Sequence, residues 1–271
     1  MRPLCDTGDM GVGLPRLSTH PQIVQHGTNP PRAKLRGGQL PSHYTCGLSQ
    51  RLKKLASMNP SSLDPHVLAL LGAVVAYLIG SLSFAVIVSR VFGLADPRSY
   101  GSGNPGATNV LRSGNKGAAV LTLLFDALKG YLPVALAVHL GWDPVTVTAI
   151  GLGAFIGHLW PVFFKFEGGK GVATAAGVLL GFAPALGGLV LLVWLAMAIV
   201  FRYSSLAALT AAIAAPLIHV TGWAGSVASV QTAGIVVMSA LLIWRHAANI
   251  RKLLAGEESK LGQKAKPPTA S

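Results

Sequence analysis

Charged side chains are scarce in this chain. Asp, Glu, Lys and Arg make up 11% of its 271 residues, whereas 51% of the residues are hydrophobic. A typical soluble domain carries about 25% charged residues, so this deficit argues strongly against an ordinary water-soluble globular protein. Acidic residues are the rarer sign, with 9 Asp and Glu against 22 Lys and Arg and a net charge of +13. Where the basic residues lie therefore decides which partners they indicate.

Cysteine is almost absent as well. Cys5 and Cys46 are the only two, so residues 58–271 offer no disulfide, zinc–thiolate site or thiol nucleophile. Residues 1–57 are rich in Pro, Gly and His and carry a charge of +6. They contain neither a periodic apolar run nor the apolar core of a secretory signal. We expect residues 1–57 to be a disordered basic leader upstream of a true start at Met58, and residues 58–271 to form the functional domain.

Long apolar stretches dominate the chain from Val67 onward. The first, Val67–Val88, has 22 residues without a charge, enough for a helix to cross about 30 Å of hydrocarbon. Backbone polar groups must be satisfied internally within lipid, which favours helices. Turn-like breaks at 181–184 and 222–225 divide the two longest stretches. The pattern predicts an all-α polytopic membrane protein with seven transmembrane helices, at roughly 67–88, 118–140, 145–164, 171–182, 184–201, 205–221 and 230–244.

The basic residues are segregated by this arrangement. Alternating crossings place 13 of the 14 basic residues after Met58 on one face, and the other face carries only Asp64 and Asp143. Lys and Arg accumulate in cytoplasmic loops, so the N-terminus is predicted outside and the C-terminus in the cytoplasm. A basic leader would then have to be exported, and a start at Met58 removes that conflict.

The loop before the second predicted helix is rich in glycine and in hydrogen-bond donors. Glycine allows close backbone approach, so that successive amides can point at an anion. Arg112 adds a planar guanidinium suited to phosphate. A tight surface turn is the alternative. We expect an anion site formed by Ser102, Gly103, Asn104, Gly106, Thr108, Asn109 and Arg112.

A second glycine-rich loop opens directly into the fourth predicted helix. It contains Gly168, Gly169, Lys170 and Gly171, and a helix N-terminus favours negative charge. The spacing is not that of a P-loop, and a preceding strand is missing. We expect Lys170 to bind phosphate, the alternative being a lysine that snorkels to the membrane interface.

Smaller polar groups complete the pattern. Ser205 stands at the start of the sixth helix, where it could cap amides or bind a ligand, and His246 and Asn249 are spaced to share a helical face. Both groups fall on the face that carries the glycine loops. Asp126 and Lys129 lie within the second helix, where charges are costly unless paired, so we expect a structural ion pair there.

These motifs, in this order, resemble the bacterial acyl-phosphate:glycerol-3-phosphate acyltransferases, the PlsY family, over about residues 66–260. That family has no basic leader of this kind. The resemblance rests on Gly80-Ser81, Gly101–Asn109, Asp126–Gly130, Gly157-His158 with Pro161, Gly168–Thr174, Arg202-Tyr203-x-Ser205-Leu206, Arg245-His246-x-x-Asn249-Ile250, and an acidic position at Glu257 or Glu258.

The resemblance implies transfer of a fatty acyl group from acyl phosphate to glycerol 3-phosphate, giving 1-acylglycerol 3-phosphate (lysophosphatidic acid) and phosphate in phospholipid biosynthesis. It also implies a multi-pass protein of the bacterial inner membrane whose active site faces the cytoplasm, without a metal or organic cofactor. The expected partners are the two substrates, the lipid bilayer and the soluble enzyme that forms acyl phosphate. Nucleic acid is not expected.

The residues can be assigned roles on this basis. Acyl phosphate is already activated, so the protein needs mainly to position the substrates and to stabilise charge. The two loops with Arg112 and Lys170 would hold phosphate groups. Ser205, His246 and Asn249 would orient the glycerol hydroxyl and the reacting carbonyl. Either His246 or a substrate phosphate oxygen could accept the hydroxyl proton.

Two other classes of protein are compatible with the composition. A phosphate or organophosphate transporter would also combine apolar helices with basic loops, but transporters commonly show internal repeats and a midplane site. No repeat is evident here. The break at 181–184 is the feature that best fits a transporter. A structural protein that binds anionic lipid through its basic tail is the weaker alternative.

Overall fold

The computed structural model describes residues 64–222 and 229–263. The chain divides into two units, Met1–Ser57 and Met58–Ser271, and all described residues belong to the second. The expected leader, both cysteines and the proposed start at Met58 lie outside the described residues. So does most of the turn expected at 222–225.

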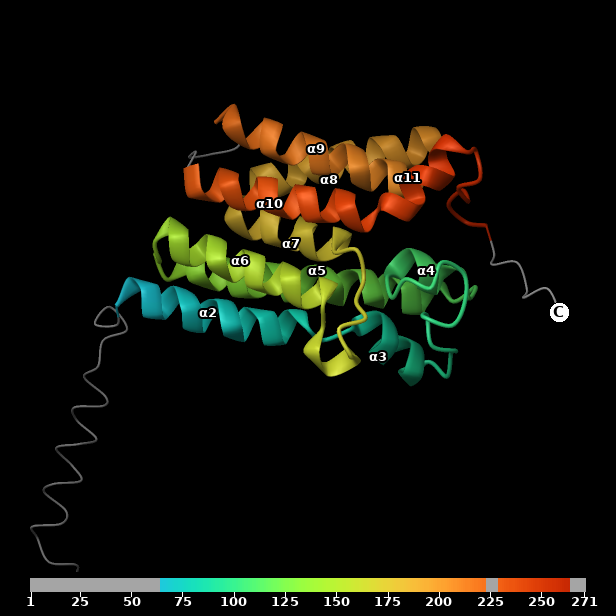
Figure 1. Cartoon of the computed structure of the whole chain (residues 1–271), viewed down its shortest axis with the longest axis horizontal. Coiled ribbons are helices and arrows are strands. Elements are labelled where there is room, and N and C mark those ends of the chain that lie inside the picture. Colours follow the sequence, from blue (N-terminus) through green and yellow to red (C-terminus); the bar gives the residue numbers. More distant parts are fainter. Residues whose placement is uncertain (1–63, 223–228, 264–271) are drawn as a thin grey trace, which may run out of the picture. The chain divides into compact units, whose positions relative to one another are not determined.

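Every regular element in the described part of the chain is a helix (Figure 1), which confirms the all-α prediction. Each of the seven segments predicted from the sequence contains at least one helix. The elements are α2 (Pro65–Gly80), α3 (Phe84–Val91), α4 (Ala107–Leu111), α5 (Lys116–His139), α6 (Pro144–Leu159), η2 (Val162–Phe164), α7 (Val172–Phe182), α8 (Pro184–Phe201), α9 (Ser204–Val220), α10 (Ser229–Arg245) and α11 (Ala247–Leu254).

The helices differ in their ability to cross a membrane. Among the described residues, 4 spans are long and apolar enough, Pro65–Val91, Lys116–His139, Pro144–Phe164 and Pro184–Phe201. A fifth is added if α10 and α11, which meet at a bend of 57°, are taken as one broken span. Helices α7 and α9 are apolar but shorter. Several membrane-spanning helices are thus present, and seven crossings stay a prediction.

The first predicted helix is not continuous, and in this detail the sequence prediction was wrong. Helix α2 ends at Gly80 and α3 begins at Phe84. At the break the Ser81 hydroxyl donates to the Tyr77 carbonyl at 2.8 Å. The freed carbonyl of Leu82 accepts a hydrogen bond from the Lys129 ammonium at 2.7 Å. A polar contact inside the bundle therefore replaces the backbone hydrogen bond that the break removes.

Aspartates begin two of the long helices. Asp64 accepts a hydrogen bond from the His66 amide at 2.8 Å, and Asp143 accepts from the amides of Val145 and Thr146 at 2.9 and 3.1 Å. Each aspartate precedes a proline in the first helical position, where the missing N–H costs no hydrogen bond. The two acidic residues predicted on the outer face are therefore N-caps.

Small residues allow the helices to pack closely. Helix α6 is central, because 11 of its 16 residues are buried. On α5 and α7 the backbones approach so closely that a Cβ built on Gly177 would lie 2.9 Å from the Ala127 carbonyl carbon. Such contacts between small residues are typical of helix packing in membranes. By contrast, α8 buries few residues and exposes large apolar side chains such as Leu192 and Val200.

Replacing Gly177 with Ala should destabilise the bundle. The added methyl would also lie 3.0 Å from the Tyr131 amide nitrogen, and overpacking of this kind costs about 1–3 kcal/mol. We expect the Tm of the detergent-solubilised protein to fall by roughly 5 °C.

The matched control is Gly188→Ala, because a Cβ at Gly188 in α8 meets nothing within 4 Å. That substitution should leave the Tm unchanged or raise it, since alanine is the better helix former. Equal Tm losses in the two variants would contradict the packing of α5 against α7.

Candidate active site

The predicted polar clusters lie at one end of the helices, as the sequence predicted. Figure 1 shows α3, α4, α11 and the segment between α6 and α7 at this end. Hydrogen bonds join segments far apart in the chain. They link Arg98 to Glu167, Thr108 to Ser204, Arg112 to Ser259, Lys170 to Asn249, Ser205 to Glu258, and Arg245 to Gly168 and Gly169.

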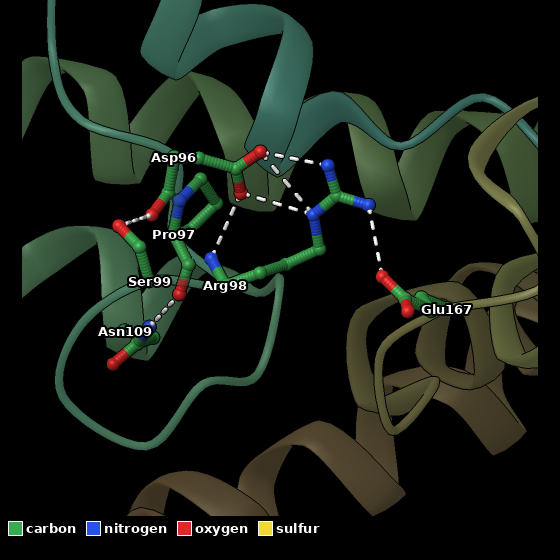
Figure 2. A network of polar contacts seen from close by, with 6 residues as sticks. All are labelled: Asp96, Pro97, Arg98, Ser99, Asn109 and Glu167. Carbon is green, nitrogen blue, oxygen red and sulfur yellow. Dashed lines mark hydrogen bonds and ion pairs between the residues drawn. The ribbon is translucent and has the colours of Figure 1, made fainter.

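Asn109 holds the first glycine loop in shape. Its side-chain amide donates to the Pro97 carbonyl at 2.6 Å (Figure 2). It also donates to the Tyr100 carbonyl at 3.1 Å, and its Oδ1 accepts from the Ser102 amide at 2.9 Å. Both N–H donors of this buried amide are therefore in use. The sequence predicted Asn109 as a phosphate ligand, but the structure places its donors inside the loop.

The outer part of the first loop is open. Ser102 and Gly103 are exposed and Asn104 and Gly106 are half-buried, and Gly101 and Gly103 adopt positive φ angles of 61° and 67°. Within residues 64–222 and 229–263, no hydrogen bond connects the side chain of Ser102 or Asn104 to Lys170. The structure thus brings Arg112 and Thr108 into contact with the other clusters, and leaves the tip of the loop facing outward.

An ion-pair network joins the two glycine loops (Figure 2). Asp96 accepts hydrogen bonds from Arg98 Nη2 at 2.7 Å and Nε at 3.0 Å, and Arg98 Nη1 lies 3.2 Å from Glu167. The side-chain hydrogen bond from Arg98 lowers the pKa of Asp96, so the carboxylate is charged at neutral pH. Pro105 is near as well, since a Cβ built on Gly169 would lie 3.0 Å from its carbonyl oxygen. The sequence prediction missed this network, although the turn-forming run Asp-Pro-Arg was its visible signal.

Arg245 holds the second loop from the other side. Its guanidinium donates to the Gly168 carbonyl at 2.7 Å and to the Gly169 carbonyl at 3.0 and 3.2 Å. Both glycines are buried and have no room for a side chain. Gly171 has a φ of 84° and precedes the first residue of α7. Arg245 was not predicted as a site residue, and only its place beside His246 in the last motif pointed to it.

The centre of the site is a carboxylate surrounded by donors. Glu258 Oε1 accepts hydrogen bonds from the Ser205 hydroxyl and the Asn249 amide, both at 2.7 Å. Lys170 donates to Asn249 Oδ1. Three residues predicted from separate motifs are therefore in one network. The acid that binds them is Glu258, whereas Glu257 is exposed, and Glu258 was not among the site residues predicted from the sequence.

Lys170 lies in an unusual environment for a lysine. Burial lowers its pKa to about 8, and the charges of Arg112, Arg245 and Lys252 act in the same direction, while Glu258 opposes them. A pKa near neutrality makes the charge of this ammonium sensitive to its surroundings. A phosphate group bound beside Lys170 would favour the charged form.

His246 lies at the bend between α10 and α11 with its imidazole buried. Its Nδ1 is 2.8 Å from the carbonyl oxygen of Leu242. A carbonyl only accepts hydrogen bonds, so Nδ1 carries the proton and Nε2 keeps its lone pair. Lys170, Glu258 and Arg245 are the charged groups that act on this ring. The imidazole is thus oriented as a hydrogen-bond acceptor beside the central network.

The segment after α11 folds back across the site. The Leu261 amide donates to the Arg202 carbonyl at 2.7 Å, and Arg112 donates to the Ser259 hydroxyl. Directly before these two contacts in the chain, Glu258 binds Ser205 and Asn249. Residues 258–261 therefore lie against α9, α11 and the first loop at once, a placement that the sequence did not predict.

Comparison with known proteins agrees with this arrangement. The family model described as "Glycerol-3-phosphate acyltransferase" matches residues 70–256. A glycerol-3-phosphate acyltransferase of Burkholderia ambifaria is 62% identical over 197 residues, which are 73% of this chain and 92% of the relative. The crystal structure of PlsY (YgiH), an integral membrane glycerol 3-phosphate acyltransferase, in its glycerol 3-phosphate form is 42% identical with a TM-score of 0.67, covering 72% of this chain and 96% of that one. Its lysophosphatidic acid form is 40% identical with a TM-score of 0.66, covering 72% and 95%. This chain belongs to the glycerol-3-phosphate acyltransferase family.

Proposed function

We propose that this protein transfers a fatty acyl group from acyl phosphate to glycerol 3-phosphate, releasing phosphate and 1-acylglycerol 3-phosphate. The observation that carries the proposal is the convergence of Lys170, Ser205 and Asn249, from three distant motifs, around the Glu258 carboxylate. Arg112 and Arg245 add positive charge beside them. Such a set of donors suits the phosphate groups that both substrates carry.

The related structures support this choice of substrate. They are described as the glycerol 3-phosphate form and the lysophosphatidic acid form of an integral membrane acyltransferase. One is the proposed acceptor and the other the proposed product. By family membership, the same pair of molecules is expected at the site of this chain.

The reaction needs no nucleophile from the protein. A glycerol hydroxyl oxygen attacks the carbonyl carbon of acyl phosphate, an ester bond forms, and the bond from that carbon to the phosphate oxygen breaks. Phosphate leaves with the electron pair, and its charge is stabilised by Arg112 and Lys170. His246 Nε2 takes the hydroxyl proton, because Nδ1 is already committed to Leu242. Ser205 and Asn249 orient the hydroxyl and the reacting carbonyl.

The roles of the loop residues follow from their contacts. Asn109 supports the first loop from inside, and Gly168, Gly169 and Gly171 supply the close turn that carries Lys170. Ser102, Gly103, Asn104 and Gly106 lie on the open side of the first loop. The amides of Ser102, Gly103 and Gly106 already donate within the loop, so the Ser102 hydroxyl and the Asn104 side chain are the donors that can meet a phosphate arriving from solution. Thr108 holds this loop to the start of α9 through Ser204, at 3.1 Å between the hydroxyl oxygens.

The membrane arrangement completes the proposal. Seven crossings, with α7 and α9 as short ones, put the N-terminus outside and the site in the cytoplasm of the bacterial cell. The face with the site then carries 13 of the 14 basic residues after Met58, as the positive-inside bias requires. Acyl chains stay in the inner membrane, glycerol 3-phosphate enters from the cytosol, and a soluble enzyme supplies acyl phosphate. Residues 1–57 are a leader upstream of a start at Met58.

The purified protein in detergent should release phosphate from acyl phosphate only when glycerol 3-phosphate is present, with one acylated glycerol phosphate formed for each phosphate. Phosphate release is followed by a colorimetric assay and the product by mass spectrometry. A transporter would instead move glycerol 3-phosphate into vesicles without forming product. Uptake without coupled product formation would exclude the acyltransferase.

The activity should decline in alkaline solution because of Lys170. Its pKa is lowered to about 8, so the ammonium is charged below that pH and loses its proton above it. We expect kcat/KM to fall about tenfold per pH unit above the pKa. Lys170→Arg should move this decline out of the measured range, because arginine stays charged.

Lys165→Asn is the matched control for this experiment. Lys165 is exposed on the same segment with a φ of 55°, a conformation that asparagine tolerates. Its pH profile should match that of the wild type. An alkaline decline that persists in Lys170→Arg would assign the titrating group elsewhere.

Replacing His246 with Gln tests which group accepts the proton. Glutamine can hydrogen-bond but cannot accept a proton at neutral pH, so kcat should fall by roughly 100-fold or more. His139→Gln, an exposed histidine at the last residue of α5, should retain full turnover. Near-full turnover of His246→Gln at every pH would assign proton removal to a substrate phosphate oxygen.

A further inference from the structure

A cluster of buried polar side chains lies within the bundle and outside the proposed site. The ammonium of Lys129 and the carboxylate of Asp126, both on α5, are 2.7 Å apart. His158 Nδ1 on α6 lies 3.6 Å from that carboxylate, and the Thr174 hydroxyl on α7 is 3.2 Å from the same nitrogen. All four side chains are buried. The ion pair expected from the sequence is therefore confirmed, and it has two further members.

The hydrogen-bond directions in this cluster can be assigned. The Thr174 hydroxyl donates to the backbone carbonyl of Asp126 at 2.9 Å, which uses its only hydrogen. It must therefore accept from His158 Nδ1, and His158 carries a proton on that nitrogen. The cluster thereby links α5, α6 and α7 through side chains with defined donor and acceptor roles.

The cluster also contacts the loop that carries Lys170, on both sides of that residue. The Gly169 amide donates to the His158 carbonyl at 3.2 Å, and a Cβ built on Gly169 would lie 3.1 Å from His158 Cε1. After Lys170 the chain enters α7, where Thr174 belongs to the first turns. His158 thus fixes the residue before Lys170, and Thr174 fixes the helix that follows.

Lys129 connects the cluster to the other glycine loop. Its ammonium donates to the Leu82 carbonyl at 2.7 Å, at the break between α2 and α3, and lies 5.7 Å from the ring centroid of Phe84. Helix α3 leads directly into the first loop. The buried cluster therefore contacts the start of the helix that leads to the first loop and, through His158 and Thr174, both sides of Lys170 in the second loop.

Mere packing does not require charge at these positions. Apolar side chains of similar volume commonly stabilise a protein as well as a buried ion pair does. Directional hydrogen bonds fix the relative positions of the elements they join more narrowly than apolar contacts do. A polar cluster that contacts the second loop and the helix before the first loop is consistent with control of their geometry.

We propose that Asp126, Lys129, His158 and Thr174 are positioning residues that hold Lys170 and the second glycine loop in register with the first loop. This inference rests on the proposed function for its kinetic consequence. The placement of Lys170, which is the structural part of the proposal, can be measured without turnover.

Thr174→Val tests the proposal by removing the hydroxyl while keeping the shape of the side chain, and Thr174→Ser restores the hydroxyl. We expect kcat/KM to fall at least tenfold in Thr174→Val and to stay within threefold of the wild type in Thr174→Ser. Asp126→Asn, which removes the charge that faces Lys129 and His158, should resemble Thr174→Val.

The matched control is His219→Gln, which removes a comparable buried contact between helices. His219 Nδ1 on α9 lies 2.9 Å from the Thr232 hydroxyl on α10, away from both glycine loops. This variant should lower the Tm as much as Thr174→Val does, with kcat/KM within twofold of the wild type. The proposal is overturned if Thr174→Val and Asp126→Asn lose Tm in the same way and keep their kcat/KM.

Chemical labelling of Lys170 gives a readout that does not depend on activity. The pH dependence of its reductive methylation, followed by mass spectrometry, reports its pKa, which is about 8 in the intact loop. Burial is the main cause of that low value, so a displaced loop should raise the midpoint in Thr174→Val and leave it unchanged in His219→Gln. If the wild type showed no acyl transfer, the proposed function would fail and this midpoint alone would decide the inference. An unchanged midpoint in Thr174→Val would then overturn it.

Discussion

The buried pair of Asp126 and Lys129 is the constraint on which the rest of the structure depends. An isolated charge among apolar helices is costly, so each must find a partner within the bundle. The two side chains form an ion pair at 2.7 Å, and Lys129 also supplies the donor that the break between α2 and α3 requires. The break in the first span and the charge in the second are thus mutually dependent. Removal of either would leave a buried polar group unpaired.

Close helix packing makes this arrangement possible. Gly130 and Gly177 let α5 and α7 approach until their backbones are in contact, which brings Thr174 within reach of the Asp126 carbonyl. Larger residues at these positions would clash with the facing backbone and push the two helices apart. The small residues are therefore needed for packing and also for the polar contacts that packing allows.

The sequence predicted most of the helices and the gathering of the polar clusters at one end of them, because both depend on local patterns. Apolar length marks a helix regardless of its neighbours, and the alternation of crossings assigns each loop to a face. It also identified Lys170, Ser205 and Asn249, which the structure joins through Glu258. These residues stand in glycine-rich or capping contexts that are visible in a short window.

Other features could not be predicted because they depend on contacts between distant residues. The apolar run from Val67 to Val88 has no proline and gives no sign of a break at which the Leu82 carbonyl accepts a hydrogen bond from Lys129. Asn109 was predicted to bind phosphate, because an asparagine amide can donate to a phosphate as well as to a backbone carbonyl. Only the fold shows that both its donors are used within the loop. Arg245 binds Gly169 and Gly168, which lie 76 and 77 residues away along the chain. Glu258 binds Ser205, which lies 53 residues away.

The central network also explains how the proposed phosphate site can hold several cations close together. Lys170, Arg112 and Arg245 repel one another, and burial of Lys170 adds to the cost of its charge. Glu258 offsets part of this repulsion and gives Ser205 and Asn249 an acceptor. A phosphate group that enters offers the same donors more negative charge and more acceptor oxygens than one carboxylate. The network is therefore oriented for the anion that the proposed function requires, and little reorganisation is needed when such an anion replaces part of its contacts.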